Sequence, residues 1–322
     1  MERTKIVLVL VAVILCQSLF AGSSGTTAVN YLKIGVGARA VGMGEAQVAL
    51  ADNVDSPYWN PAGLAEIKRD EIGLMHLIYW EGISYDYLAY ATPIKDIGVF
   101  AVSGTLLNSG AIEKTIENLT GTDYTIDGTF NYLAFSGVIS YATKFKVEDI
   151  PLSVGVNVKL IGDKIDTDSV MGVGLDIGAM SEVDKDLSVG LTASNFGLLF
   201  GKSVALPLTF KVGIAYRMEL MEKVHVLTLA ADGVLPMDSK IRANMGMEYS
   251  LNNTVYVRGG YKLNYDLESL TMGAGCRLNI GREQYELNYA FAPAKEDMGT
   301  THRISFIVRF GLPVGEVFEQ QQ

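Results

Sequence analysis

The chain has 322 residues, enough for one large domain or two ordinary ones. Hydrophobic residues make up 49% of it and charged residues only 19%, a more apolar balance than a soluble domain of this size needs. The formal net charge of −10 argues against a nucleic-acid partner, because nucleic acids select basic surfaces.

Residues 1–23 are typical of a signal peptide. Arg3 and Lys5 form a basic start, residues 6–15 are an unbroken apolar run, and small residues suited to cleavage follow. One of the two cysteines lies in this segment, which leaves Cys276 without a disulfide partner in the mature chain. Beyond this region no stretch of about 18 residues lacks a charge, so the sequence predicts no further membrane-spanning helix.

Residues 24–68 precede every predicted strand and contain closely spaced glycines. Glycine permits backbone angles and close approaches that other residues forbid. The residue before a proline is pushed toward an extended conformation, so Asn60 and Pro61 predict a tight turn. We therefore expect a compact N-terminal plug onto which the rest of the chain closes. Its candidate residues are Gly35, Gly37, Arg39, Gly42, Gly44, Trp59, Asn60 and Pro61.

Residues 35–40 also match the dinucleotide-binding fingerprint G-x-G-x-x-A, and Asp55 follows at about the expected distance. That fingerprint requires a preceding strand, a following helix and alternating βαβ units. The downstream sequence shows strands without helices, so the match does not favour a nucleotide site.

From residue 69 onward, large apolar residues alternate with polar, charged or small ones. Phe210, Val212 and Ile214 form the apolar set in one clear example. Alternate residues point to opposite faces of a strand, and a helix could not sort these sets. The predicted strands lie at residues 71–80, 83–93, 97–107, 129–143, 150–161, 169–180, 187–196, 205–217, 224–235, 239–251, 254–263, 269–280, 283–293 and 301–311.

Most of these segments have the length that a tilted strand needs to cross a bilayer, and an even number of antiparallel strands can close into a barrel. The sequence therefore predicts an all-β fold, an antiparallel transmembrane β-barrel of about 14 strands. The barrel is expected over residues 69–311, after the N-terminal plug and before a C-terminal tail at residues 312–322. A soluble β-sandwich or propeller is the alternative fold.

Charged residues of these strands lie on the small and polar face. A charge that faces hydrocarbon costs about 2–4 kcal/mol at the bilayer midplane, so these side chains are expected to point into the lumen. They could form ion pairs that fill the barrel, which the interleaved acidic residues favour, or line a path for an anionic ligand. The lumen-facing candidates are Lys211, Arg217, Arg242, Glu248, Arg258, Arg277, Glu286 and Arg303.

Residues 109–128 form a long polar stretch that is expected to be an outward-facing loop. At the other end of the chain, Phe310 would supply the terminal aromatic residue of the last strand.

The sequence contains no pattern that indicates catalysis. The three histidines have no paired metal-ligand spacing, and no nucleophile motif is present. Asp163, Asp166 and Asp168 cluster in a turn but lack the glycine and closing glutamate of a calcium loop. We therefore expect no enzyme activity, no cofactor and no metal site.

Residues 32–44, 48–53 and 59–64 resemble the N-terminal signature of the PorV/PorQ family, which belongs to the FadL-like outer-membrane barrels. Residues 258–261 and 301–310 resemble the closing strands of that family. The first similarity is long and specific, the second is weaker, and together they bracket nearly the whole mature chain.

Resemblance to the FadL group implies transport of hydrophobic small molecules across the bacterial outer membrane, with a plug that controls passage and a lateral opening into the bilayer. Resemblance to PorV implies instead a component of type IX secretion that hands cargo proteins to surface attachment. A structural outer-membrane protein is a third possibility. The expected partners are outer-membrane lipid and either a hydrophobic ligand or secreted cargo proteins.

Overall fold

The computed structural model describes residues 25–118, 121, 123–221, 224–295 and 298–314. The expected signal peptide at residues 1–23 and most of the expected C-terminal tail lie outside the described residues. In the part of the chain that is described, no helix is long and apolar enough to cross a membrane.

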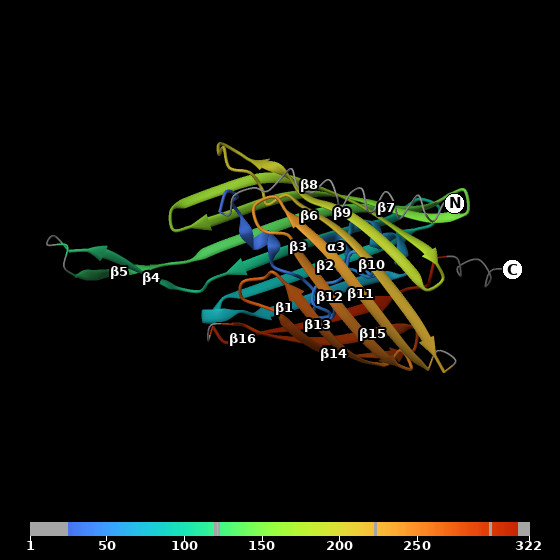
Figure 1. The fold of residues 1–322 in the computed structure, drawn as a ribbon. Helices are drawn as coiled ribbons and strands as arrows, with labels where there is room; N and C mark the ends of the chain where they lie inside the picture. Colours follow the sequence, from blue (N-terminus) through green and yellow to red (C-terminus); the bar gives the residue numbers. More distant parts are fainter. Residues whose placement is uncertain (1–24, 119–120, 122, 222–223, 296–297, 315–322) are drawn as a thin grey trace.

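Within these described ranges, fourteen antiparallel strands form one closed barrel (Figure 1). Each strand pairs with the next barrel strand along the chain, and the first pairs with the last. The predicted all-β barrel of about 14 strands is therefore confirmed. The strands are β1 Asp70–Ile78, β2 Ser84–Ile94, β3 Gly98–Asn108, β6 Tyr132–Val147, β7 Ile150–Ile165, β8 Asp168–Asp184, β9 Leu187–Leu199, β10 Thr209–Leu220, β11 His225–Pro236, β12 Arg242–Leu251, β13 Val255–Leu263, β14 Leu270–Ile280, β15 Glu283–Pro293 and β16 Thr300–Phe310.

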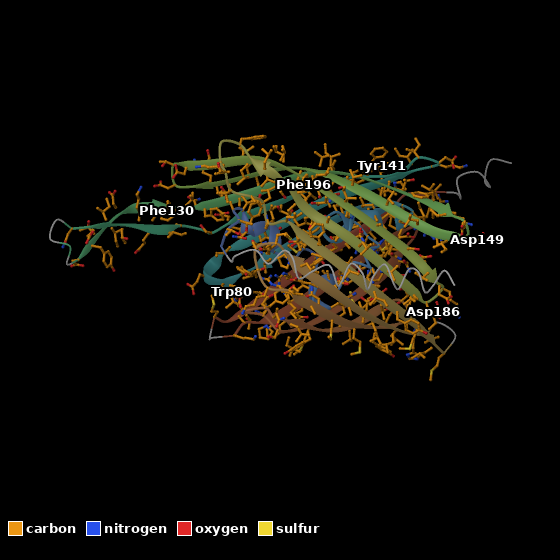
Figure 2. The ribbon with its side chains drawn as sticks, turned by 45° about the horizontal axis from the view of Figure 1, so that its top comes forward. Trp80, Phe130, Tyr141, Asp149, Asp186 and Phe196 are labelled. Carbon is orange, nitrogen blue, oxygen red and sulfur yellow. The ribbon has the colours of Figure 1, made fainter. Side chains whose placement is uncertain are left out.

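Burial alternates along the strands as the sequence pattern predicts. In β1, Met75 and Leu77 are buried, whereas Leu74 and Ile78 are about half exposed. Because alternate side chains point to opposite faces, the wall has an apolar outer surface and a small, polar and charged inner surface. Figure 2 shows the side chains that project from the outer wall.

Short helical segments precede β1 and lie inside the barrel (Figure 1). The segment α2 packs against β13, β14, β15 and β16, whereas η3 packs against β3, β6, β7 and β8. Residues 25–68 therefore bridge opposite walls of the lumen. The helical segments are η2 Asn30–Lys33, α2 Ala38–Gly42, α3 Ser56–Trp59 and η3 Pro61–Glu66; a further turn, η4 Trp80–Gly82, joins β1 to β2.

The two ends of the barrel differ in their connections. Short turns join β6 to β7, β8 to β9 and β14 to β15 at the end where β1 begins and β16 finishes. Longer connections, such as residues 200–208 and 264–269, lie at the opposite end, which we name the long-loop end.

The expectation of a loop at residues 109–128 is wrong. Strands β4 Ile112–Glu117 and β5 Tyr124–Phe130 form a separate two-stranded hairpin, which extends beyond the long-loop end of the barrel (Figure 1). Most of its residues are exposed on both faces. The hairpin does alternate, since Tyr124, Ile126 and Phe130 stand between polar residues, but the two runs are short and lie in a stretch rich in polar residues, a composition that favours a loop.

Because the β4–β5 hairpin takes no part in the closed sheet, it is expected to be dispensable for barrel stability. Replacing residues 111–130 by a short Gly-Ser turn should leave the free energy of unfolding within about 0.5 kcal/mol of the parent value. Urea unfolding in detergent micelles measures this difference. A loss of several kcal/mol would show that the hairpin supports the barrel.

Candidate functional site

Glycines allow the N-terminal segment to lie directly against the barrel wall. Gly44 has a φ of +64°, and a Cβ atom there would lie 2.6 Å from the Met245 carbonyl oxygen and 2.8 Å from the Tyr261 nitrogen. Gly37 has a φ of +77° and leaves room for the Asp55 carboxylate. These two positions require glycine both for backbone conformation and for close approach. Gly35 packs on Trp59, and Gly42 packs on the backbone of Gly273.

Asn60 ties the segment to itself and to the wall. Its Nδ2 donates to the Val48 carbonyl at 2.8 Å and to the Ala179 carbonyl of β8 at 3.1 Å. Its Oδ1 accepts from the Ala62 nitrogen, which caps η3 at the Pro61 turn. Trp59 Nε1 donates to the Val36 carbonyl at 3.0 Å. The side chain of Asn60 is fully buried, so these bonds hold the two halves of the segment together.

Ion pairs join the segment to one side of the lumen. Arg39 donates from Nε and Nη2 to the two carboxylate oxygens of Glu248, at 3.0 and 3.1 Å. Glu248 also accepts from Arg258 Nε at 2.6 Å. Arg39 reaches back to Asp52 of its own segment at 2.6 Å. The Glu248 carboxylate therefore pairs with one cation of the wall, Arg258, and with one cation of the N-terminal segment, Arg39.

A second set of ion pairs lies beside the first. Glu286 binds Arg277 and Arg309, each at 2.8 Å, and Arg309 also binds Glu71 at 2.8 Å. Glu71 in turn accepts from the Val54 nitrogen at 3.0 Å. The strands β1, β14, β15 and β16 are thus linked across the seam where the barrel closes.

The structure brings most of the predicted lumen residues together. Glu248, Arg258, Glu286 and Arg303 are buried inside, and Arg277 reaches Glu286. Lys211 Nζ lies 4.9 Å from the Trp59 ring, and Arg242 lies over the Tyr265 ring at 4.6 Å. Arg217 is apart from these residues, because it lies exposed near the short-turn end of β10.

Two wall features were not found from the sequence. Asp232 of β11 accepts from the backbone nitrogens of Gln47 and Val48 at 2.7 and 3.0 Å, so it anchors the middle of the segment. Inward glycines of the wall, such as Gly155 and Gly246, leave space in which the backbones of Pro61 and Met43 lie. The sequence feature that could have revealed both is a glycine or an aspartate on the polar face of a predicted strand.

A polar cavity of about 270 Å³ opens between the N-terminal segment and the long-loop end. Its lining includes Glu45, Trp80, Arg242, Tyr265 and Arg303. We name it the vestibule.

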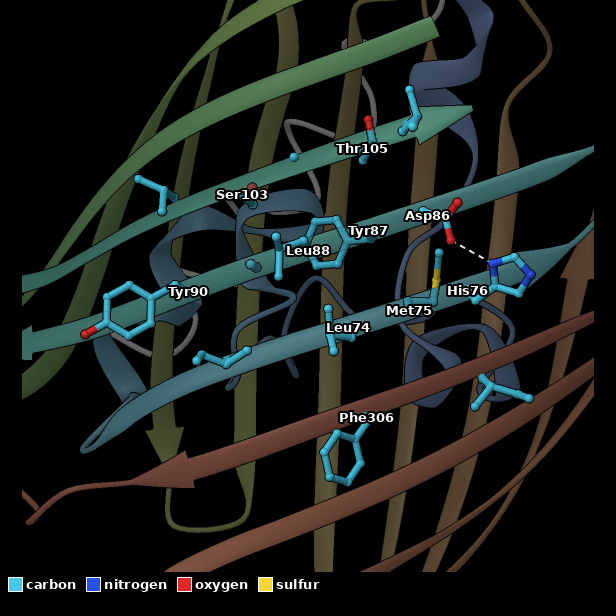
Figure 3. Close-up of a pocket in the computed structure, with 16 residues that line it drawn as sticks. Leu74, Met75, His76, Asp86, Tyr87, Leu88, Tyr90, Ser103, Thr105 and Phe306 are labelled. Carbon is cyan, nitrogen blue, oxygen red and sulfur yellow. Dashed lines mark hydrogen bonds and ion pairs between the residues drawn. The ribbon is translucent and has the colours of Figure 1, made fainter. Parts of the chain in front are cut away.

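An apolar groove of about 790 Å³ lies along the wall over β1, β2, β3 and β16 (Figure 3). Leu74, Leu88 and Phe306 line it from the outer surface. Two inward residues also line it: Tyr87 donates from its hydroxyl to the Val54 carbonyl at 3.0 Å, and Met75 Sδ accepts from the Gly37 nitrogen at 3.1 Å. The groove therefore lies where the wall contacts the N-terminal segment.

Protonation of Asp55 is expected to hold the segment more firmly at low pH. Burial, aided by Glu286 and Glu71 and opposed by Arg309 and Arg39, raises the pKa of Asp55 to about 7. An unfolded aspartate has a pKa of about 3.9, so the folded state binds more protons between these values and stability falls as pH rises through that window.

Limited proteolysis of residues 25–68 between pH 4 and pH 8 measures this effect. The parent chain should become more sensitive as pH rises, and the Asp55→Asn variant should lose that part of the dependence. Identical pH profiles for the two chains would contradict the assignment.

Among known proteins, only solved structures are similar to this chain. No family model matches the chain, and no curated protein matches it. The toluene transporter TodX of Pseudomonas putida aligns with a TM-score of 0.59 at 13% identity, over 85% of this chain and 97% of that one. The toluene transporter TbuX of Ralstonia pickettii aligns with a TM-score of 0.56 at 13% identity, over 86% of this chain and 99% of that one.

A Pseudomonas aeruginosa FadL homologue gives a TM-score of 0.46 at 11% identity, over 85% of this chain and 97% of that one. No comparison shows the PorV/PorQ family. At these identities the likeness shows the fold alone: the chain is similar in fold to the barrels of two toluene transporters.

Proposed function

We propose that this chain is an outer-membrane, FadL-like barrel that transports hydrophobic small molecules across the outer membrane of a bacterium. The observation that carries the proposal is the fold, because over most of its length the barrel is similar to TodX and TbuX, both described as toluene transporters. The apolar outer surface supports a place in lipid, and the short turns at one end with longer connections at the other fit an outer-membrane orientation.

In this proposal residues 24–68 are the plug, and the groove between β1, β2, β3 and β16 is where a ligand leaves the wall for the bilayer. The groove is almost entirely apolar, and Met75 and Tyr87 connect it to the plug by hydrogen bonds. A shift of the plug would therefore release two side chains that line the groove. This coupling supports control of passage by the plug.

Toluene uptake by cells that produce or lack the protein tests this function. Producing cells should take up toluene faster. Gly104 lies in the groove, so Gly104→Phe should slow uptake, whereas Gly259→Phe, with no atom near its Cβ position, should leave uptake unchanged. Equal uptake with and without the protein would exclude the transport function, and equal uptake by the two variants would exclude the groove.

A second candidate is the expected role in type IX secretion, as a component that hands cargo proteins to surface attachment. The β4–β5 hairpin supports it, because Ile116, Tyr124 and Ile126 are each about half exposed or more on a two-stranded sheet that extends from the barrel. In cells with that secretion system, removal of the hairpin should leave cargo unattached while toluene uptake persists. Normal attachment in the absence of the hairpin would exclude it as the contact.

A further inference from the structure

Three buried N–H donors without an acceptor belong to residues that line one cavity, the vestibule. They are Trp80 Nε1, Arg242 Nε and Arg303 Nε, and each atom is buried. They come from the β1–β2 connection, from β12 and from β16, so they are distant in sequence. Buried donors in folded proteins are almost always hydrogen-bonded to protein or to ordered water, so three exceptions among the residues of one cavity favour an acceptor that enters it.

The surrounding residues do not supply the missing acceptors. Arg303 is 2% exposed and donates from Nη1 to Thr301 Oγ1 at 3.1 Å. Among the residues that the structure describes, neither Arg303 nor Arg242 has a carboxylate oxygen within ion-pair distance. The carboxylates of Glu45 and Glu268 instead both bind Lys262, at 2.8 and 2.9 Å.

An unpaired guanidinium is costly to bury, because the charge loses its hydration. The arrangement becomes favourable if a bound group supplies oxygen acceptors. Guanidinium N–H groups make their strongest hydrogen bonds with ionised oxygens. The guanidinium donors therefore favour an oxyanion over a hydroxyl or an amide.

The other residues of the vestibule indicate which ligand, apart from its oxyanion group, would fit the cavity. The rings of Tyr79, Trp80 and Tyr265 line the cavity, and Arg242 already stacks on Tyr265. Its volume of about 270 Å³ is below the roughly 300–1,000 Å³ of sites for drug-sized ligands. A single aromatic ring with one oxyanion group suits both the size and the lining.

We propose that the vestibule binds the oxyanion group of a small anion, with an aromatic carboxylate as the ligand that fits best. The lining holds cations and carboxylates in nearly equal number, so binding depends on hydrogen bonds to the unpaired N–H groups rather than on a strong positive field. The cations are Lys33, Arg242, Lys262 and Arg303, and the carboxylates are Glu45, Asp266 and Glu268. The site does not depend on the passage of uncharged molecules through the apolar groove.

Calorimetry on the purified full chain in detergent tests the site with a matched pair of ligands. Benzoate and toluene share a ring and differ in the carboxylate, so benzoate should bind and toluene should bind at least about tenfold more weakly, since hydrogen bonds to charged groups carry the difference. Inorganic phosphate, as competitor, distinguishes a free oxyanion from one carried by a ring. If phosphate competes with an affinity equal to that of benzoate, the site recognises the oxyanion and the ring is dispensable. If phosphate competes more weakly than benzoate binds, the site favours the aromatic carboxylate.

Variants assign the binding to the three donors. Arg303→Gln should weaken benzoate binding about tenfold or more, and Trp80→Phe, which keeps an aromatic ring and removes one N–H, should weaken it severalfold. Arg282→Gln, an exposed arginine at the opposite end of the barrel, is the control and should change nothing.

Three results would overturn the proposal: no binding of benzoate or phosphate, toluene binding as tight as benzoate, or parent-like affinity in both Arg303→Gln and Trp80→Phe. Toluene uptake is measured separately, so loss of this site and failure of the transport function are distinguishable.

Discussion

Replacing Glu248 by glutamine is expected to destabilise the barrel by about 3–5 kcal/mol, because it leaves the buried Arg258 guanidinium without its paired carboxylate and leaves Arg39 with Asp52 alone. Glu248 binds Arg39 of the N-terminal segment and Arg258 of β13, and its side chain is only 6% exposed. Glutamine keeps the shape and one oxygen acceptor but not the negative charge. The measurement is the free energy of unfolding in urea, in detergent micelles or lipid vesicles.

Glu113→Gln is the control for this change, since Glu113 lies exposed in the β4–β5 hairpin and should shift stability by less than about 0.5 kcal/mol. The Arg39→Gln, Glu248→Gln double variant completes a cycle, and a coupling energy of about 0.5–3 kcal/mol is expected for side chains in direct contact. A Glu248→Gln loss no larger than that of Glu113→Gln would mean that the lumen is wet enough to screen the pair.

Gly44→Ala is expected to release the N-terminal segment from the wall. A Cβ at this position would overlap the backbones of β12 and β13, and the φ of +64° adds about 1–2 kcal/mol of strain for a non-glycine residue. Together with the cost of overpacking, about 1–3 kcal/mol, the loss should reach about 2–5 kcal/mol. Faster proteolysis within residues 25–68 and a lower free energy of unfolding are the readouts.

Gly281→Ala provides a closely matched control. Gly281 has the same φ of +64°, but its Cβ would meet no atom within 4 Å. Its loss should therefore equal the strain contribution alone, and the difference between the two variants isolates contact with the wall. Equal losses would show that Gly44 is needed for its backbone angle and not for close approach.

Sequence alternation was sufficient to predict the barrel because an apolar outer surface and an enclosed polar lumen make opposite demands on successive residues. Strands such as β12 and β14 kept their predicted positions within a few residues. Strand β10 begins at Thr209 rather than at residue 205, because residues 200–208 belong to the long-loop end and escape the demands of the wall. The β4–β5 hairpin escaped prediction because its two short alternating runs lie in a polar stretch that favours a loop.

The candidate site could be predicted only in part. The alternation along the strands places Arg217 and Arg258 on the same inner face of the barrel. It does not give their positions along the barrel axis, and because of these positions Arg217 is exposed whereas Arg258 is buried. The role of Asp232 depends on which part of the N-terminal segment reaches β11, a pairing of residues that are distant in sequence. Neither the vestibule nor its unpaired donors leaves a pattern in the linear sequence, because its lining comes from separate connections and strands.

The pairing of β1 with β16 has a consequence for biogenesis. Asp70 lies opposite Phe310, so ring closure must wait until nearly the entire polypeptide has been delivered. Such a long-range pairing is entropically slow. Since residues 25–68 are attached directly to β1, they adjoin the edge that the last strand joins. The order in which the ring closes and the amino-terminal segment folds therefore decides whether that segment is enclosed at closure or has to enter a finished cylinder.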